Sequence, residues 1–394
     1  MKIRRIILKG VRNFTDFDRS FEDSWTSEVS ESLLLVGPNG SGKSTILNVI
    51  AALWQILYDF LEENERPPET SFNMTSGSAV FNTTAGSPTI SGEKGKLPDR
   101  RFFDLLAESK LAAIEIQGFL NSPNFWIFAG NNPSIVDKFI HEFSSELRIG
   151  RLYQREKSSD LTEIVDTFHE PGNLDAQITD ALEVYPEWYT NWRDNLVQNV
   201  YGSQHNLPNI VYLESETRIL QSVKFIGGMT PEPDEFQWLA RYEPTTSRKG
   251  SLQNYLFAQK AVNPVLFNDL IKQVNSFFNG KKLTEFSPKT YQMMVQVGNQ
   301  KHTIEELSSG EKQIILMLVT VVRRLEEGGI VMIDEPDLHL HVSLVNAFVS
   351  HLRKMISEKK GQLILASHAP ELWRMFNEGE LVRLGKLANQ EDGE

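Results

Sequence analysis

The chain has 394 residues, 40% of them hydrophobic, which is enough apolar material for one large domain with an insertion or for two domains. It contains no Cys, which excludes disulfides, thiolate zinc sites and cysteine nucleophiles. A formal net charge of −12 argues against a surface built mainly to bind nucleic acid, because phosphate contacts require Lys and Arg. The sequence shows neither an apolar run of roughly 20 residues nor a signal-peptide pattern, so we expect a cytoplasmic protein with no membrane partner.

Charge is unevenly distributed along the chain. Residues 156–187 carry nine acidic side chains against the single Lys157, so we expect no DNA contact there. The first twelve residues, by contrast, contain five cations and no acid: Lys2, Arg4, Arg5, Lys9 and Arg12. Two interpretations stay open for this strip, a local surface for DNA or RNA and a solvated strand edge guarded by Lys and Arg.

The N-terminal part predicts two strands, a glycine-rich loop, a helix and a long surface loop, in that order. Residues 2–9 alternate as a strand does, and "SLLLVG" (32–37) is a continuous apolar run typical of a strand buried on both faces. After a glycine-rich loop, "STILNVIAALWQILYDFLEE" is apolar around most of its circumference, which predicts a buried helix. Residues 62–101 are rich in Pro, Ser, Thr, Gly and Asn and predict a long surface loop.

The middle of the chain predicts a hairpin, helices and another strand. "LAAIEIQGFL" (111–120) and "FWIFAG" (125–130) flank a turn and predict antiparallel strands. Residues 135–205 have a mostly helical pattern. Three aromatic residues near its end could be packing residues or a base-stacking platform: Trp188, Tyr189 and Trp192. "NIVYLES" (209–215) predicts a buried strand.

The C-terminal part alternates strands with helices. A strand and turn at 291–307 precede a helix at 308–327, a strand at 328–336, a helix at 343–360, and a strand and turn at 361–372. Such alternation predicts an α/β fold, with a mainly parallel sheet flanked by helices.

"GPNGSGKS" (37–44) fits the pattern G-x-x-x-x-G-K-S/T, after an apolar strand and before a helix, as a phosphate-binding P-loop requires. Backbone N–H groups of such a loop surround phosphates, and the helix N-terminus adds partial positive charge. We expect Lys43 to reach the β- and γ-phosphates of ATP and the Ser44 hydroxyl to ligate Mg²⁺. The expected nucleotide-binding residues are Gly37, Pro38, Asn39, Gly40, Ser41, Gly42, Lys43, Ser44 and Thr45.

"IVMIDEP" places two carboxylates directly after a buried hydrophobic strand. Asp334 is expected to hold Mg²⁺, usually through water, and Glu335 is expected to act as general base or to position the attacking water. A pair of surface acids is the alternative, although surface acids rarely follow four consecutive apolar residues.

Three further strings follow the P-loop in the order found in one ATPase family. "LSSGEKQ" (307–313), "DEP" (334–336) and "SHAPEL" (367–372) resemble the signature, Walker B and switch-histidine motifs of ABC-type ATPases. "IRRIILKGVRNFTDF" and "DEPDLHLH" resemble the branch that includes SMC, RecF and OLD-type ATPases. The resemblance implies a P-loop ABC-type head with an antiparallel β lobe and a helical insertion. Residues 1–61 and 286–394 would form its core, and 62–285 the lobe and insertion that carry partner or nucleic-acid specificity.

The resemblance also implies roles for individual residues. Ser308 and Gly310 would contact the γ-phosphate bound by an opposing protomer, and His368 would sense that phosphate and the attacking water. Residues 337–341 would lie at the dimer seam. Ser309 departs from the more usual Gly, which we interpret as a trait of the branch. A glutamine of the Mg²⁺ shell is not identified, with Gln117 and Gln154 as candidates.

The resemblance favours an ATPase that forms ATP-sandwich dimers or higher oligomers and regulates a protein effector, such as a nuclease or toxin-like protein, in antiphage defence. The alternatives are a RecF-like DNA-repair ATPase that binds DNA, the nucleotide-binding subunit of a transporter, and a scaffold that binds ATP without hydrolysing it. Two apparent sites carry less weight. His339 and His341 have no evident third metal ligand, and Ser367, His368 and Glu371 lie too close on one turn to form a hydrolase triad.

Overall fold

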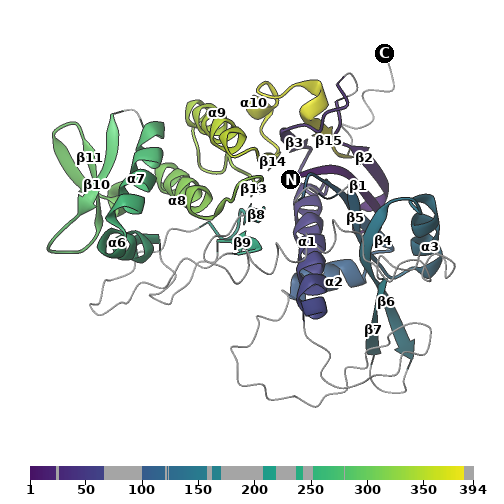
Figure 1. Cartoon of the computed structure of the whole chain (residues 1–394). Helices are drawn as coiled ribbons and strands as arrows, with labels where there is room; N and C mark the ends of the chain where they lie inside the picture. The colour runs from purple at the N-terminus through teal and green to yellow at the C-terminus, as the bar shows by residue number, and fades with distance from the viewer. Residues whose placement is uncertain are drawn as a thin grey trace. The chain divides into compact units, whose positions relative to one another are not determined.

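The computed structural model divides the chain into two compact units, each described by itself (Figure 1). Unit 1 comprises Met1–Ser30 and Asn39–Leu207, and unit 2 comprises Glu31–Pro38 and Pro208–Glu394. The functional division predicted at residues 61 and 286 stays a prediction. The structure describes residues 1–23, 26–65, 100–119, 122, 124–157, 162–169, 207–218, 237–242, 252–278 and 280–385.

Unit 1 is built on a six-stranded sheet with the order β2-β1-β4-β5-β6-β7. Neighbouring strands run antiparallel except β5 and β6, which are parallel. The predicted hairpin is the β4–β5 pair, and the first predicted strand is β1. The strands are β1 (Lys2–Val11), β2 (Phe14–Ser20), β4 (Leu111–Gln117), β5 (Phe125–Gly130), β6 (Leu147–Lys157) and β7 (Thr162–His169).

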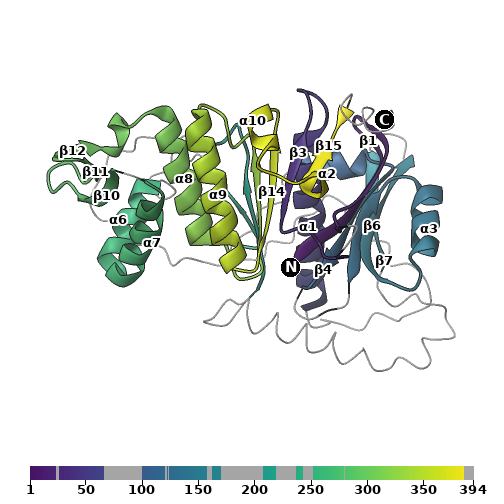
Figure 2. The same cartoon turned by 90° about the horizontal axis from the view of Figure 1, so that it is seen from above.

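Helices cover both faces of this sheet. The predicted buried helix is α1 (Lys43–Glu65), which contacts β4, β5 and β6 and lies beside α2 (Arg100–Ala107). On the opposite face, α3 (Pro133–Glu142) packs on β5 and β6 (Figures 1 and 2). The apolar cluster under α3 joins alternate strand residues to one side of the helix, as the period of two requires: Ile7, Leu111, Ala113, Trp126, Phe128, Leu152, Val136, Phe139 and Phe143.

The helical pattern predicted for 135–205 is wrong in part. Only α3 is helical among the described residues of this range, and β6 and β7 pair as antiparallel strands. β6 carries three Arg residues, whereas β7 contains strand-favouring Thr, Ile, Val and Phe, so the sequence of β7 already favours a strand. The aromatic residues Trp188, Tyr189 and Trp192 lie outside the described residues.

Unit 2 contains the predicted parallel sheet. Its strand order is β15-β3-β14-β13-β8-β9, and every neighbouring pair is parallel. Parallel strands need crossover connections, and helices supply several of them. The strands are β3 (Ser32–Val36), β8 (Ile210–Leu213), β9 (Leu239–Arg241), β13 (Ile330–Asp334), β14 (Gln362–Ser367) and β15 (Leu381–Arg383).

Helices α8 (Ser309–Arg324) and α9 (Val342–Glu358) lie side by side along one face of the parallel sheet (Figure 2). Alternate residues of the central strands point into the core beneath them, as the period of a strand requires: Leu34, Val36, Val211, Leu213, Val331, Ile333, Leu363 and Leu365. Because both the strands and the inner faces of the helices are apolar, this core holds the strands in place beneath α8 and α9. The carboxyl ends of β13 and β14 are therefore held in register, with Asp334 opposite Ala366.

The rest of unit 2 is a helical pair, a small antiparallel sheet and short helices. The sheet has the order β10-β11-β12 and leads through η2 directly into α8. Among the described residues, no helix combines the length and apolarity that crossing a bilayer requires. The elements are α6 (Leu252–Val262), α7 (Pro264–Phe277), β10 (Lys281–Phe286), β11 (Met293–Val297), β12 (Gln300–Thr303), η2 (Ile304–Glu306), α10 (Pro370–Trp373) and η3 (Glu378–Glu380).

Candidate nucleotide site and catalytic turn

The predicted P-loop begins where β3 ends, and its backbone needs glycine. Gly40 has φ of 78° and Gly42 has φ of 101°, conformations that residues with a Cβ rarely adopt. A Cβ on Gly42 would also lie 2.5 Å from the Phe14 ring, whereas one on Gly40 would meet no atom within 4 Å. The loop is therefore closed on the Phe14 side and open at Gly40.

The turn between β1 and β2 braces this loop within unit 1. Asn13 donates a hydrogen bond from Nδ2 to the Gly40 carbonyl at 2.6 Å, and Phe14 packs against Gly42. The string "GVRNF" by itself predicts only a turn. It does not reveal the side chains that hold the P-loop backbone, because only the fold brings residue 13 next to residue 40.

The loop has the features of a phosphate cradle. The backbone N–H of Ile46 donates to the Gly42 carbonyl at 3.0 Å, which starts α1 directly after the glycine. Lys43 and Thr45 are buried at the helix start, and Ser44 is exposed. Ser41 Oγ is buried and has no hydrogen-bond partner among the described residues, so it can donate to an added group. These features fit the phosphates of a nucleotide.

The acidic pair after β13 occupies a turn whose backbone is strained. Asp334 is the last residue of β13 and is 5% exposed. Glu335 has φ of 48°, in the left-handed region, and its N–H donates to the Ala366 carbonyl at 2.7 Å. Because the chain turns sharply at this point, the two adjacent carboxylates leave the strand in different directions.

His368 stands beside Glu335 at the end of the neighbouring strand β14. Its Nδ1 lies 3.5 Å from Glu335 Oε1, and the side chains are 47% and 27% exposed, respectively. Both groups can thus contact an added molecule while contacting each other. The structure brings the two expected catalytic residues together from elements 33 residues apart in sequence, as parallel pairing of β13 with β14 requires.

The residues after these two are also linked. Ser367, at the end of β14, donates from its Oγ to Asp337 Oδ1 at 2.6 Å and accepts a hydrogen bond from the N–H of Ala369 at 3.0 Å. Ser367 is fully buried. It therefore ties the loop that carries Asp337 to the loop that carries His368, and it does not serve as a nucleophile exposed to substrate.

The signature string begins α8 with a capping box. Ser308 is the N-cap residue, and its Oγ accepts from the Glu311 N–H at 3.3 Å. The Glu311 carboxylate in turn accepts from the N–H and the hydroxyl of Ser308, at 3.1 and 2.9 Å. Burial raises the pKa of Glu311, but hydrogen bonds from Lys281 and Ser308 outweigh it and keep that pKa below its ordinary value. A carboxylate therefore occupies the exposed Ser308 groups that an incoming phosphate would need.

Gly310 is required by close packing between this helix and the loop after the acidic pair. A Cβ at Gly310 would lie 2.7 Å from the His339 carbonyl oxygen and 2.8 Å from Leu340 Cδ2. His339 itself has φ of 64°, and His341 begins α9 as its N-cap residue. The structure thus places the signature helix in contact with residues 337–341 of the same chain.

Arg218 is a site residue that the sequence did not reveal. It follows β8, is 2% exposed, and donates from Nη2 to the carbonyl oxygen of Glu335 at 2.7 Å. In the sequence it stands after "ESET", which resembles a surface turn, so nothing distinguished it from a solvated arginine. Its neighbourhood with Glu335 exists only because β8 pairs with β13.

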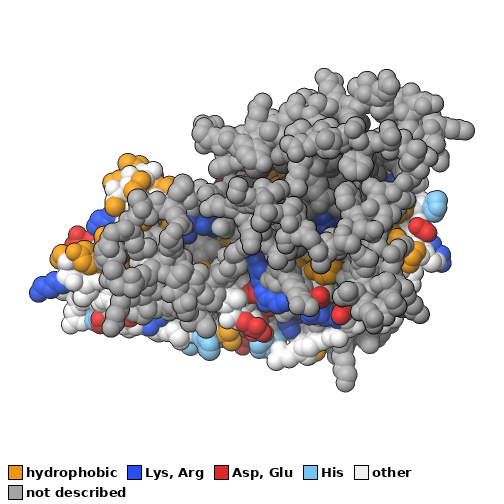
Figure 3. Space-filling view, turned by 90° about the horizontal axis from the view of Figure 1, so that it is seen from below, with side chains coloured by type: hydrophobic (Ala, Val, Ile, Leu, Met, Phe, Trp, Pro, Cys, Tyr) orange, Lys and Arg blue, Asp and Glu red, His pale blue; other side chains and the backbone are white. Residues whose placement is uncertain are grey.

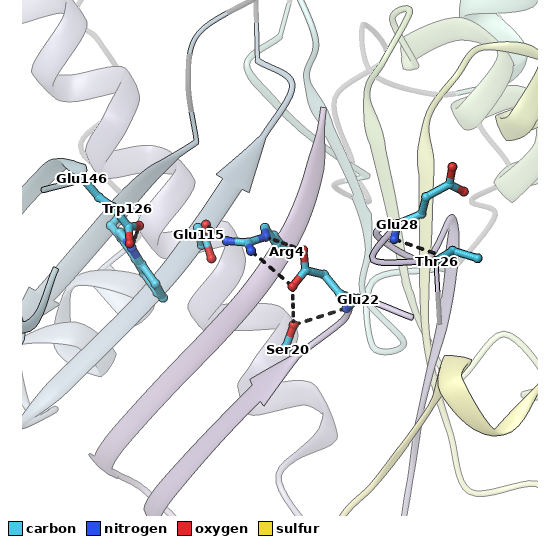
Figure 4. Close-up of polar contacts among 8 residues, drawn as sticks. All are labelled: Arg4, Ser20, Glu22, Thr26, Glu28, Glu115, Trp126 and Glu146. Atoms are coloured by element: carbon cyan, nitrogen blue, oxygen red, sulfur yellow. Dashed lines mark hydrogen bonds and ion pairs between the residues drawn. The ribbon is translucent and has the colours of Figure 1, made fainter. Parts of the chain in front are cut away.

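The basic strip near the N-terminus is largely engaged within unit 1. Figure 4 shows the Arg4 guanidinium between the carboxylates of Glu22 and Glu115, and both pairs are ion pairs. Arg5 pairs with Asp18 at 2.7 Å. The strand-edge interpretation is wrong, because β1 is paired with β2 on one side and β4 on the other. On the face seen in Figure 3, basic and acidic side chains are interspersed among the coloured residues.

The candidates for the glutamine of the Mg²⁺ shell stay unresolved. Gln117 is the last residue of β4 and Gln154 lies on β6, of which the structure describes only the backbone at that position. The other expected donors, the Asp334 carboxylate and the Ser44 hydroxyl, supply the hard oxygen ligands that Mg²⁺ prefers. Their chemistry fits the ion.

The comparisons with known proteins agree with these motifs. A family described as "AAA domain, putative AbiEii toxin, Type IV TA system" matches residues 120–374, a range that includes the acidic pair, Ser308 and His368. The Retron Vc95 probable ATPase of Vibrio cholerae serotype O1 biovar El Tor is 23% identical over 405 residues, covering 94% of this chain and 71% of that protein.

Two further relatives match over shorter stretches. The Retron Ec83 probable ATPase of Escherichia coli is 28% identical over 132 residues, which cover 31% of this chain and 24% of that protein. The Septu protein PtuA of Bacillus mycoides strain KBAB4 is 27% identical over 205 residues, which cover 48% of this chain and 26% of that protein. The alignments thus span only about a quarter of these two relatives.

Proposed function

Because this chain belongs to the AAA-domain family described as "AAA domain, putative AbiEii toxin, Type IV TA system" and is a P-loop ATPase, we propose that it hydrolyses ATP at a site shared between two copies. One copy would supply the P-loop and the acidic pair, and the other would supply the signature residues Ser308 and Gly310. The observation that carries the hydrolytic part is the pairing of Glu335 with His368 at the ends of adjacent parallel strands.

In the proposed reaction, Glu335 positions the attacking water and accepts its proton, and His368 contacts both the water and the γ-phosphate. Lys43 and the N–H groups of the P-loop stabilise the charge on the phosphates. Asp334 and Ser44 would hold Mg²⁺, which would draw charge from the phosphate oxygens when bound. These roles are supported by the positions of the side chains, which lie at a strand end or at a helix start.

Substituting Glu335 by Gln tests the assignment of the general base. The amide keeps the size and hydrogen-bonding ability of the side chain but cannot accept the proton. We expect the turnover of ATP to fall by a factor of about 10² to 10⁴ while ATP binding stays within about twofold. Glu327→Gln is the matched control, because Glu327 is 68% exposed and its ion-pair partner among the described residues is the exposed Lys360. Unchanged turnover in Glu335→Gln would remove Glu335 from the mechanism.

The shared site rests on where the signature motif lies. The exposed N-terminus of α8 carries the partial positive charge of the helix, which suits a phosphate oxygen. The Ser308 hydroxyl could donate to that oxygen once it leaves the Glu311 carboxylate. Contacts to the γ-phosphate would favour the closed dimer, and hydrolysis would remove them and shift the population back. A protein that binds the closed dimer would then respond to whether ATP is bound or hydrolysed.

We infer that the biological output is regulation of a protein effector, such as a nuclease or toxin-like protein, in antiphage defence. Support comes from the relatives named as retron and Septu proteins. Purification of the tagged protein from its native host, followed by mass spectrometry of bound protein and nucleic acid, tests this proposal. Recovery of DNA without any protein partner would favour the RecF-like repair function instead.

A further inference from the structure

We propose that Arg218 is a positioning residue that sets the backbone of the catalytic turn at Glu335 and connects this turn to the signature helix α8. The inference rests on the proposed function of Glu335 and goes beyond it, because Arg218 belongs to none of the sequence motifs. Arg218 does not touch substrate in this account. It acts through the carbonyl of Glu335 and through Met317, a fully buried residue of α8.

The first argument concerns the strain at Glu335. A left-handed backbone at a residue other than Gly is unfavourable and persists only where the surroundings hold it. Three hydrogen bonds do so here. The Glu335 N–H donates to Ala366 O at 2.7 Å, and the Glu335 carbonyl accepts from the Leu338 N–H at 3.2 Å and from Arg218 Nη2 at 2.7 Å. Of these three, only the bond to Arg218 comes from a side chain, so it can be removed by substitution.

The second argument concerns geometry. The Arg218 guanidinium is planar and rigid, and its two terminal nitrogens contact different elements. Nη2 binds the carbonyl of the catalytic turn, while Nη1 lies 3.7 Å from Met317 Sδ on α8. A movement of α8 is therefore transmitted to the turn through one rigid group. Because Ser308 is the N-cap residue of α8, this group links the helix that is proposed to face another copy's nucleotide with the base that is proposed to act on the chain's own nucleotide.

The third argument concerns charge. Burial lowers the pKa of Arg218 to about 10, while the carboxylates of Asp334, Glu335 and Asp337 favour its charged form. The side chain therefore stays cationic at neutral pH and partly balances the acids of the site. A buried arginine without such partners would be strongly unfavourable.

The test is Arg218→Lys, which keeps the positive charge but replaces the planar fork by a single flexible donor. We expect kcat for ATP to fall at least about tenfold while KM changes less than about twofold. Arg353→Lys is the matched control. Arg353 also donates to a backbone carbonyl, that of Met375 at 2.9 Å, but it belongs to the packing of α9 against η3. The kcat of Arg353→Lys is expected to stay at the wild-type value.

The double variant Arg218→Lys with Glu335→Gln separates a positioning role from a general structural one. If Arg218 acts by placing Glu335, its substitution adds no more than about a twofold loss once Glu335 is already Gln. Multiplication of the two single effects would overturn the proposal, as would wild-type kcat in Arg218→Lys. Normal turnover in Glu335→Gln would instead contradict the proposed function of Glu335.

Folding is monitored by thermal unfolding and by binding of a fluorescent ATP analogue. Arg218→Gln serves as a second variant, because it removes the charge but keeps an amide donor. We expect both variants to bind the analogue and both to lose turnover. If neither variant folds well enough to bind it, Arg218 serves stability alone and the proposal fails.

Discussion

Glu335 combines a strained backbone with an ionisable side chain that has direct access to solvent. A positive φ at such a residue costs on the order of 1–3 kcal/mol. Asn tolerates this conformation better than Glu, since its short side chain can bond to the local backbone. A glutamate at position 335 therefore provides a reactive carboxylate but lowers the stability of the fold. Such a trade-off is expected at functional sites.

The strain predicts that Glu335→Asn abolishes turnover without destabilising the fold. We expect a free energy of unfolding equal to that of the wild type or higher by up to about 1 kcal/mol. Thermal or urea unfolding followed by circular dichroism measures it, and an ATPase assay on the same sample confirms the loss of turnover. A loss of more than about 1 kcal/mol would mean that the Glu335 side chain itself stabilises the turn.

The Arg4–Glu115 pair predicts a pH-dependent stability. Burial raises the pKa of Glu115 above its ordinary value even though Arg4 lowers it. A carboxyl with a raised folded-state pKa binds protons more readily when folded, so stability from this group falls as the pH rises through the window between the unfolded and folded pKa values.

We expect Arg4→Met to remove about 3 kcal/mol of stability near neutral pH, because the buried Glu115 carboxylate loses its cation. Its pKa rises further in the variant, so the deficit relative to the wild type becomes smaller as the pH is lowered toward about 5. Arg5→Met is the control. Its partner Asp18 is 43% exposed, and a pair of that kind contributes at most about 1 kcal/mol. A pH-independent deficit in Arg4→Met would contradict this account.

At the scale of elements, the signature helix and the loop 337–341 can approach closely because Gly310 has no side chain. A Cβ at this position would lie 2.7 and 2.8 Å from atoms of the loop, which is tighter than packed atoms tolerate. Residues 337–341, which the family resemblance places at a dimer seam, thus pack against the signature motif of their own chain. We expect them to move together.

Gly310→Ala is therefore expected to destabilise the protein by about 1–3 kcal/mol and to reduce turnover, since the helix must shift away from the loop. The adjacent Ser309→Ala is the control for stability, because the Ser309 side chain is exposed. Thermal unfolding distinguishes the two. Equal melting temperatures for both variants would show that the loop 337–341 shifts to make room for the added Cβ at no cost in stability.

Strands with continuous apolar runs could be predicted from the sequence. Strands that form because a neighbouring strand of the sheet pairs with them could not. The strands β3, β13 and β14 lie in the core, so burial on both faces shows in their composition. The strand β6 does not show it, because its polar residues suit several structures and the sheet decides. Local sequence also cannot report a contact such as Arg218 with Glu335, which arises from the pairing of β8 with β13.

The same limit applies to the candidate site. Motif spacing was sufficient to name Glu335 and His368, and the structure brings them within contact distance. It was insufficient to find Asn13 and Phe14, which hold the P-loop, because Asn13 contacts Gly40, 27 residues later, and Phe14 contacts Gly42, 28 residues later. Short strings thus name candidate catalytic residues, while tertiary contacts show which residues hold the loops of the site in place.

At the scale of the whole molecule, the central claim is that one chain carries two incomplete halves of a site. The P-loop would bind ATP in each chain, and hydrolysis would occur only when another copy supplies Ser308. A substitution at Ser308 should then leave ATP binding to the same chain nearly unchanged, whereas a substitution at Lys43 should abolish it. We expect Ser308→Arg to prevent both closed-dimer formation and hydrolysis, which sedimentation with ATP and an ATPase assay would measure.

Mixing two inactive variants tests the claim most directly. Ser308→Arg keeps an intact P-loop, and Lys43→Ala keeps an intact signature, so a mixed dimer contains one complete site. Random pairing of equal amounts puts about half of the chains in mixed dimers, so the account predicts recovery of up to about a quarter of the wild-type activity. A mixture that stays inactive while the wild type turns over ATP at a rate per molecule independent of protein concentration would contradict it.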